Sequence, residues 1–94
     1  MGAYSPAPVV TEELERVVLD KVMKPTIRAL KSEGINYKGI LYAGLMINKG
    51  NPIVLEFNCR LGDPETQPVL SRLKTDFMEV AMAVAEERLG DIKV

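Results

Sequence analysis

The chain has 94 residues, of which 47% are hydrophobic and 27% charged, so it can build one small globular domain and not two. Its 12 Lys and Arg against 13 Asp and Glu leave a net charge of −1, which disfavours binding to a nucleic acid through a basic surface. Histidine is absent and Cys59 is the only cysteine, which excludes catalysis by histidine, metal sites built on histidine and an intrachain disulfide.

The chain begins with a segment that predicts a loop rather than a helix. Pro6 and Pro8 lie close together within residues 1–10, and two such prolines favour extended backbone. Thr11 is then a suitable N-cap for a helix that begins near Glu12 and carries acidic residues in its first turn.

Apolar residues at helical spacing continue this predicted helix through a proline. Pro25 lacks a backbone N–H and crowds the preceding turn, yet the apolar stripe resumes at Ile27 and Leu30. We therefore expect a kinked continuation rather than a break, with Gly34 ending the helix.

The middle of the chain predicts a β-hairpin. Residues 39–47 are apolar at both odd and even positions, as in a strand that is covered on both faces. Residues 48–51 supply a polar turn. Pro52 is tolerated only at the start of a strand, so the returning strand is expected over residues 53–58. Strict alternation would place Ile53, Leu55 and Phe57 on one face, the core face, and Val54, Glu56 and Asn58 on the other.

Two further helices are expected after the hairpin. In residues 62–65, Asp63 is a candidate N-cap and is followed by a proline at the first helical position and an acid in the first turn, which predicts a short helix. Thr75 and Asp76 mark the start of a longer amphipathic helix that Gly90 closes. The fold class is therefore α+β, an antiparallel hairpin packed with two longer helices on one face, in a single domain over residues 1–94.

The polar end of the second strand is the best candidate for a functional site. Glu56 and Asn58 are two residues apart on one strand, so their side chains project to the same side, about 6.5 Å apart along the chain. A carboxylate with an amide carbonyl suits a hard cation, and magnesium is usually held by few protein oxygens, with phosphate and water as its other ligands. The alternative is that Glu56 is a solvated side chain and Asn58 a turn former at the strand end.

Three charged residues that follow extend this candidate site. Arg60 shares the parity of the pair and can clamp a phosphate with its planar fork, or else is a surface arginine. Asp63 and Glu65 are explained as residues of a helix start, and either can in addition contact a substrate amine or orient Arg60. Cys59 has the opposite parity and is expected to be a small buried hydrophobe.

Three segments of the sequence resemble one known enzyme family. They are Met-Gly-Ala-Tyr-Ser-Pro-Ala-Pro at residues 1–8, Tyr-Ala-Gly-Leu-Met at residues 42–46 and Glu-Phe-Asn-Cys-Arg-Leu-Gly-Asp-Pro-Glu-Thr-Gln at residues 56–67. Together they are similar to the C-terminal half of the ATP-grasp region of the phosphoribosylamine-glycine ligases, also called glycinamide ribonucleotide synthetases. The resemblance extends over essentially all 94 residues.

The resemblance implies an ATP-dependent ligase of purine biosynthesis that activates glycine as an acyl phosphate and joins it to phosphoribosylamine. By position, Glu56 and Asn58 match the family's ligands for Mg²⁺ or Mn²⁺, and Arg60 matches an arginine near the transferring phosphate. The loops at residues 2–8 and 63–67 match segments that line the same cleft. The family's enzymes are longer, so the resemblance implies a partial ATP-grasp domain that is inactive alone.

Two other functional classes stay open beside the ligase, namely a non-catalytic association module and a metal-binding or regulatory domain. Because residues 39–47 are apolar on both faces, we also expect the chain to self-associate. No apolar run reaches the roughly 18 residues of a membrane span, and no signal-peptide pattern is present, so we expect a cytoplasmic protein without a membrane partner.

Overall fold

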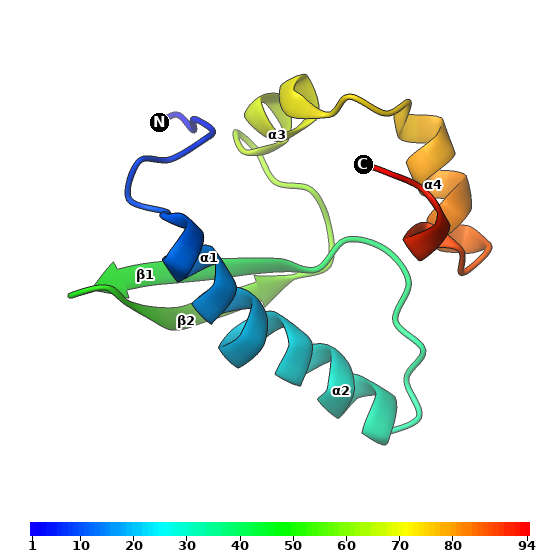
Figure 1. Ribbon diagram of the computed structural model, residues 1–94, viewed down its shortest axis with the longest axis horizontal. Helices are drawn as coiled ribbons and strands as arrows, with labels where there is room; N and C mark the ends of the chain where they lie inside the picture. Colours follow the sequence, from blue (N-terminus) through cyan, green and yellow to red (C-terminus); the bar gives the residue numbers. More distant parts are fainter.

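A computed structural model describes residues 1–94, the whole of the chain. It confirms the α+β class, with one antiparallel pair of strands and helices around it (Figure 1). No helix in it has both the length and the apolar character needed to cross a membrane. In chain order the elements are α1 (Glu12–Val18), the π-helical turn η1 (Leu19–Met23), α2 (Lys24–Ser32), β1 (Tyr42–Asn48), β2 (Asn51–Asn58), α3 (Thr66–Arg72), α4 (Phe77–Ala85) and the 3₁₀ turn η2 (Leu89–Asp91).

The first three helical elements form one run that passes through Pro25, as the sequence predicts (Figure 1). Thr11 caps this run, because its Oγ1 accepts a hydrogen bond from the backbone N of Leu14 at 3.1 Å. Pro25 has no N–H to donate to the preceding turn, and that turn is widened into η1, where the amide of Lys24 bonds to the carbonyl of Leu19 five residues back. A π-helical turn is thus how the helix continues past the proline.

Gly34 ends the helical run as predicted. Its φ of +79° lies in the left-handed region that favours glycine, and its amide donates to the carbonyl of Lys31 at 3.0 Å. The next amide, that of Ile35, donates to the carbonyl of Leu30 at 3.0 Å, which completes a Schellman motif.

The hairpin forms as predicted, with shifted strand ends. Lys49 and Gly50 both have positive φ, +50° and +79°, and make the two-residue connection between β1 and β2. The first strand begins at Tyr42 and not at residue 39, since Gly39 adopts a φ of +128° that a strand cannot continue. The second strand begins at Asn51, so it includes Pro52 as its second residue, next to the connection.

A β-bulge at Leu55 makes the predicted division of strand faces wrong. Gly44 pairs with Glu56, but the next residue, Leu45, pairs with Val54, so Leu55 is an extra residue in β2. Because directly opposed residues of a pair share a face, Ile53 lies on the face of Glu56, and Val54 lies on the other. The alternation of faces predicted for β2 therefore holds only from Glu56 to Asn58, between the bulge and the C-terminal end of the strand.

The two C-terminal helices form, with ends that differ from the prediction. Asp76 caps α4, because its Oδ1 accepts from the backbone N of Met78 at 2.8 Å. Asp63 is not the N-cap of α3, since residues 63–65 form turns and that helix begins at Thr66. The longer helix α4 ends at Ala85, where Glu87 takes the left-handed position at a φ of +59°, so Gly90 does not close it.

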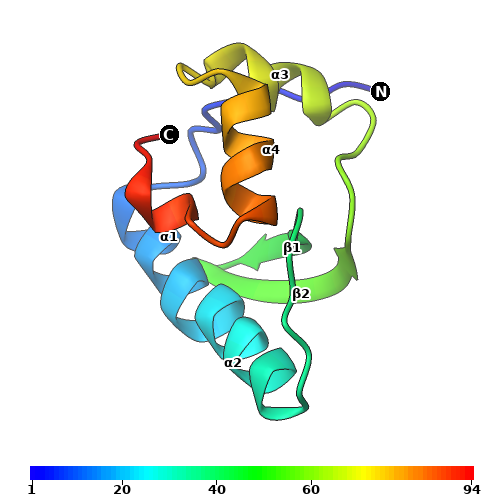
Figure 2. The same cartoon turned by 90° about the vertical axis from the view of Figure 1, so that its right-hand side faces the viewer.

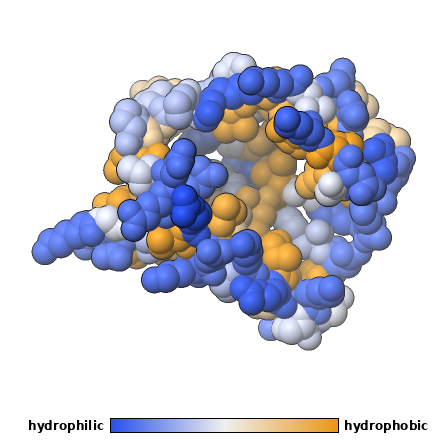
Figure 3. All heavy atoms as spheres, viewed as in Figure 1, coloured by the Kyte–Doolittle hydropathy of each residue, from blue (hydrophilic) through white to orange (hydrophobic).

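The chain buries little of itself. Only four of the 94 residues are buried, and the three hydrophobic ones are Leu14, Val22 and Ala83. Figures 1 and 2 show α1 along the hairpin and α4 beyond the end of the hairpin. The prediction that two longer helices cover one face of the hairpin is wrong in this detail. Nineteen large apolar side chains are exposed, and the space-filling view shows a hollow at the centre of the molecule with hydrophobic side chains at its floor (Figure 3).

Candidate functional site

The predicted site residues meet in one cleft at the Asn58 end of the hairpin. This cleft has a volume of about 750 Å³ and an open, mostly polar lining. All five predicted residues, Glu56, Asn58, Arg60, Asp63 and Glu65, line it. The remaining lining residues are Tyr42, Leu61, Gly62, Thr66 and Gln67.

The structure places Glu56 and Asn58 side by side on one face of β2. The Nδ2 of Asn58 donates a hydrogen bond to the Oε1 of Glu56 at 3.1 Å. Opposite them on β1, Gly44 leaves room for the glutamate, because a Cβ there would lie 3.1 Å from the Cγ of Glu56. The spacing argument for this pair is thus confirmed by their contact.

The pair fits a hard cation in the type of its donors. A carboxylate and an amide oxygen are ligands that Mg²⁺ and Mn²⁺ accept, with water or phosphate in the other positions. The amide nitrogen of Asn58 faces Glu56, so the side-chain amide must turn by half a rotation to offer its oxygen. No group of three or more Asp, Glu, Cys or His side chains is arranged to hold a metal ion.

Arg60 lies just after the end of β2 with its charge unpaired. Its Nη1 donates to the backbone carbonyl of Leu61 at 3.3 Å, and it belongs to none of the three ion pairs of the structure. An exposed guanidinium with free donors can bind a phosphate oxygen in two-point fashion. The neighbouring Cys59 is exposed, so the expectation that it is buried is wrong, because the chain leaves the strand at that point.

A tight turn over residues 62–66 sets the position of Glu65. The carbonyl of Gly62 accepts hydrogen bonds from the backbone N of Thr66, at 3.0 Å, and from its hydroxyl. Gly62 is buried, and a Cβ on it would lie 2.2 Å from the Oε2 of Glu65. In this arrangement the carboxylate of Glu65 occupies the space that a side chain at residue 62 would take.

The cleft carries more negative than positive charge. Glu56, Asp63 and Glu65 contribute three carboxylates and Arg60 contributes the single cation, a formal balance of −2. Such a cleft attracts a divalent cation before it attracts a polyanion.

Sequence reasoning did not single out Tyr42, Leu61 or Gly62 as cleft residues. Tyr42 is opposite Asn58 in the hairpin register, so the paired strand ends were a usable signal once the turn was located. Thr66 and Gln67 lie within the segment at residues 63–67 that was expected to line a cleft. Leu61 carries no signal in the sequence that would single it out.

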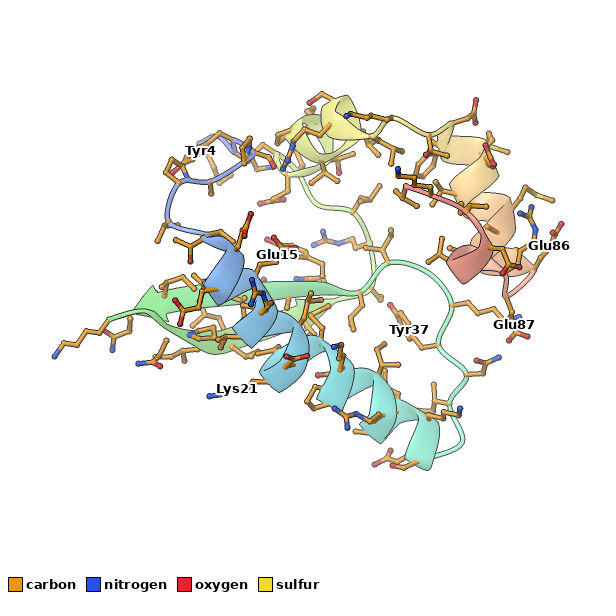
Figure 4. All side chains as sticks on the ribbon, in the orientation of Figure 1. Tyr4, Glu15, Lys21, Tyr37, Glu86 and Glu87 are labelled. Carbon is orange, nitrogen blue, oxygen red and sulfur yellow. The ribbon has the colours of Figure 1, made fainter.

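The loop at residues 2–8 lies beside the cleft rather than in its lining. Ala3, Tyr4 and Ser5 line an adjoining hollow of about 490 Å³, which shares Arg60 and Glu65 with the cleft. The side-chain view shows Tyr4 on this loop, far from Glu86 and Glu87 at the end of α4 (Figure 4). The two segments that the resemblance associates with one cleft are therefore neighbours in the structure.

Comparison with known proteins gives a consistent result. Residues 1–66 match the family model described as phosphoribosylglycinamide synthetase, ATP-grasp (A) domain. Proteins named phosphoribosylamine-glycine ligase match nearly the whole chain: 53% identity over 97% of it in Escherichia coli O6:H1, 56% over 98% in Allochromatium vinosum and 51% over 99% in Vibrio parahaemolyticus. The chain spans about one fifth of the length of these relatives, 21–22%.

Proposed function

Because the chain belongs to the phosphoribosylglycinamide synthetase family, within its ATP-grasp domain, we propose that it forms part of an ATP-dependent ligase site. The reaction is the joining of glycine to phosphoribosylamine through an acyl phosphate, in purine biosynthesis, with ATP as co-substrate. The observation that carries this proposal is the meeting of Glu56, Asn58 and Arg60 in one cleft at the end of β2.

In this proposal Glu56 and Asn58 hold Mg²⁺, or Mn²⁺ in its place. When bound, the metal ion neutralises charge on the phosphates of ATP and so lowers the barrier to phosphoryl transfer. Glu56 contributes its carboxylate directly, and Asn58 contributes its amide oxygen after the side chain turns away from the glutamate. Both side chains lie on one face because they are two residues apart on the same strand.

Arg60 is the proposed catalytic residue, because its free guanidinium donors lie in the same cleft as the metal ligands. It holds oxygens of the transferring phosphoryl group and stabilises the charge that develops on them. This requires no histidine, which the chain lacks.

Asp63 and Glu65 are proposed substrate-binding residues. Their carboxylates lie on the loop side of the cleft, where they can accept hydrogen bonds from a substrate amine or ammonium group. The amines in this reaction belong to glycine and to phosphoribosylamine. We place the protein in the cytoplasm, since an exposed unpaired thiol such as that of Cys59 suits a reducing compartment.

The test uses Mn²⁺ as a paramagnetic probe of the 94-residue chain in solution. We expect Mn²⁺ to broaden the backbone amide NMR signals of residues 56–60 and to leave those of α4 sharp. Glu56→Gln and Asn58→Leu should each abolish this selective broadening. Glu33→Gln, the same change at an exposed glutamate on the end of α2, is the matched control and should leave it intact. Equal broadening in the Glu56→Gln variant would contradict the metal site.

A second candidate is an association module, favoured by the small buried core and the 19 exposed large apolar side chains. In this case the exposed hairpin face and free strand edges pair with a second copy of the chain. Sedimentation of the chain without ligand distinguishes the candidates: association with no selective Mn²⁺ effect favours the module. A metal-binding or regulatory domain would instead bind Mn²⁺ without any response to nucleotide.

A further inference from the structure

The N-terminal segment 1–10, here called the arm, is tied to the rest of the molecule by one side-chain hydrogen bond. Arg72 at the end of α3 donates from its Nη1 to the Oγ of Ser5 at 2.7 Å, across 67 positions of sequence. No other side-chain hydrogen bond and no ion pair joins the arm to another element. In both ribbon views part of the arm passes next to α3 before the arm turns toward α1 (Figures 1 and 2).

Burial holds the arm only weakly. Met1, Tyr4, Val9 and Val10 are all exposed, with 71% of the surface of Tyr4 accessible. A segment with few buried apolar contacts opens at little cost in free energy unless a specific contact fixes it. The contact between Ser5 and Arg72 is the specific one that the structure provides.

The position of the arm matters for the cleft because the two share residues. Arg60 and Glu65 line both the cleft and the hollow that the arm lines with Ala3, Tyr4 and Ser5. The arm therefore borders the cleft from the adjoining hollow that contains Arg60 and Glu65. If it moved away, the hollow beside Arg60 would lose the lining that the arm provides, and a bound phosphate would be less well oriented.

We propose that Arg72 is a positioning residue, which holds the arm beside the ligand cleft through Ser5. Arg72 touches no cleft ligand in this role and acts through the arm alone. The inference rests on the proposed function, in which the cleft binds a metal-bound nucleotide. Arg72 is suited to the role because it is in none of the ion pairs, so its guanidinium is not committed elsewhere.

The first measurement uses no ligand and asks whether the contact holds the arm. Backbone ¹⁵N relaxation of the 94-residue chain should show greater fast motion at Ala3, Tyr4 and Ala7 in Arg72→Met than in the unaltered chain. Ser5→Ala removes the acceptor without altering α3 and should give the same result, which covers the case in which Arg72→Met does not fold. Arg28→Met on α2 is the matched control, since it removes an exposed arginine that bonds only within its own helix.

The second measurement uses the Mg²⁺ complex of a non-hydrolysable ATP analogue, AMP-PNP, followed by the amide signal of Arg60. Affinity should fall roughly three- to tenfold in Arg72→Met and in Ser5→Ala. Arg72→Lys, which keeps a charged donor at this position, should restore part of the loss. If Arg72 only stabilised the fold, its loss would lower the thermal midpoint together with the affinity. A loss of affinity that Arg72→Lys partly restores, at a constant thermal midpoint, therefore supports the positioning role.

Two outcomes overturn the inference. An arm as ordered in Arg72→Met and Ser5→Ala as in the unaltered chain would show that the contact does not hold it. A loosened arm with unchanged affinity would show that its position does not matter to the ligand. Failure of the unaltered chain to bind the probe contradicts the proposed function instead, and the ligand-free relaxation data then support or overturn the Ser5–Arg72 contact by themselves.

Discussion

Two glycines give the carboxylates of the cleft the room they occupy. Gly44 faces Glu56 across the hairpin, and Gly62 lies under Glu65 in the loop. Any side chain at either position would have to share space with a carboxylate that the proposed function uses. The cleft is thus shaped by what these two residues lack as well as by the charges around it.

Replacing Gly62 with alanine should move the carboxylate of Glu65 and leave the fold intact. The added Cβ would lie 2.2 Å from the Oε2 of Glu65, which is the flexible end of a side chain and can swing away. We expect a thermal midpoint close to that of the unaltered chain and changed NMR chemical shifts of the Glu65 side chain. Gly2→Ala, where the added Cβ would meet nothing within 4 Å, is the control. A large loss of stability in Gly62→Ala would show that the backbone cannot tolerate the change.

The burial of two leucines predicts opposite effects of truncation. In the folded chain 6% of the surface of Leu14 is accessible to solvent, against 62% of the surface of Leu55. Leu14→Ala should lower the free energy of unfolding by about 2 kcal/mol or more, and Leu55→Ala should change it by no more than about 0.5 kcal/mol. Urea unfolding of the two variants measures this. Similar losses in both would mean that Leu55 is buried in solution against something this single chain does not provide.

At the scale of elements, α4 is joined to the segment before β1 by a polar cluster. Glu87 accepts a hydrogen bond from Asn36 and pairs with Lys38 at 3.5 Å, and Lys38 also reaches the carbonyl of Ala85 at 3.4 Å. The hydrogen bond from Asn36, followed by the charge of Lys38, lowers the pKa of Glu87 below its ordinary value of 4.5. Glu87 also has a positive φ, so the same residue ends α4 and anchors it.

This lowered pKa predicts a pH-dependent contribution of Glu87 to stability. A carboxyl whose pKa is lower in the folded state stabilises the fold fully above the unfolded pKa, and the stabilisation is lost as pH falls through the folded pKa. The difference in stability between the unaltered chain and Glu87→Gln should therefore be constant above about pH 5.5 and shrink below 4.5. Chemical denaturation across this pH range tests it, with Glu33→Gln as the control. A difference that does not change with pH would contradict the coupling.

The sequence predicts most elements here because their signals are local. Caps at Thr11 and Asp76, helical periodicity and the polar turn at residues 48–51 each depend on neighbouring residues alone. The bulge at Leu55 depends on how two strands pair, and no residue type in the sequence indicates it. The end of α4 was misplaced at Gly90 because Glu87, a poor intrinsic choice for positive φ, is held there by contacts with residues 36–38.

The candidate site was predictable for a similar reason. Glu56, Asn58 and Arg60 lie within five consecutive residues, so the geometry of one extended segment brings them together. The contact of Ser5 with Arg72 spans most of the chain, and only the three-dimensional structure shows it. The prediction that Cys59 is buried is wrong because it assumes that the alternation of strand faces continues past Asn58, where β2 ends.

At the scale of the whole molecule, the chain is an open frame around a hollow. Its longest dimensions are 39 and 33 Å, while only four residues are buried (Figure 3). A domain of this size usually depends on a single well-buried core for its stability. We therefore expect self-association at micromolar concentration, measured by sedimentation. A sharp monomer near 10.4 kDa that binds no hydrophobic dye would contradict this expectation.

The 94-residue chain alone should show no ligase activity. The cleft offers one cation, Arg60, and it is open to solvent, so it cannot hold a triphosphate in line for transfer. Release of ADP from ATP in the presence of glycine, phosphoribosylamine and Mg²⁺ is the measurement. Turnover near that of ordinary enzymes would show that the chain is sufficient by itself.

The bulge at Leu55 divides the hairpin into two parts that can vary in length independently. Leu55 of β2 has no partner on β1. The alternation of strand faces in the tip of the hairpin, between Leu45 and Val54, is therefore out of phase with that at the end that bears Glu56 and Asn58. An insertion or deletion of one residue at the bulge shifts the phase of the tip and leaves the polar end in register. Among related sequences, changes of length in this hairpin should therefore accumulate on the turn side of Leu55, and an engineered loop could be grafted there without disturbing the cleft.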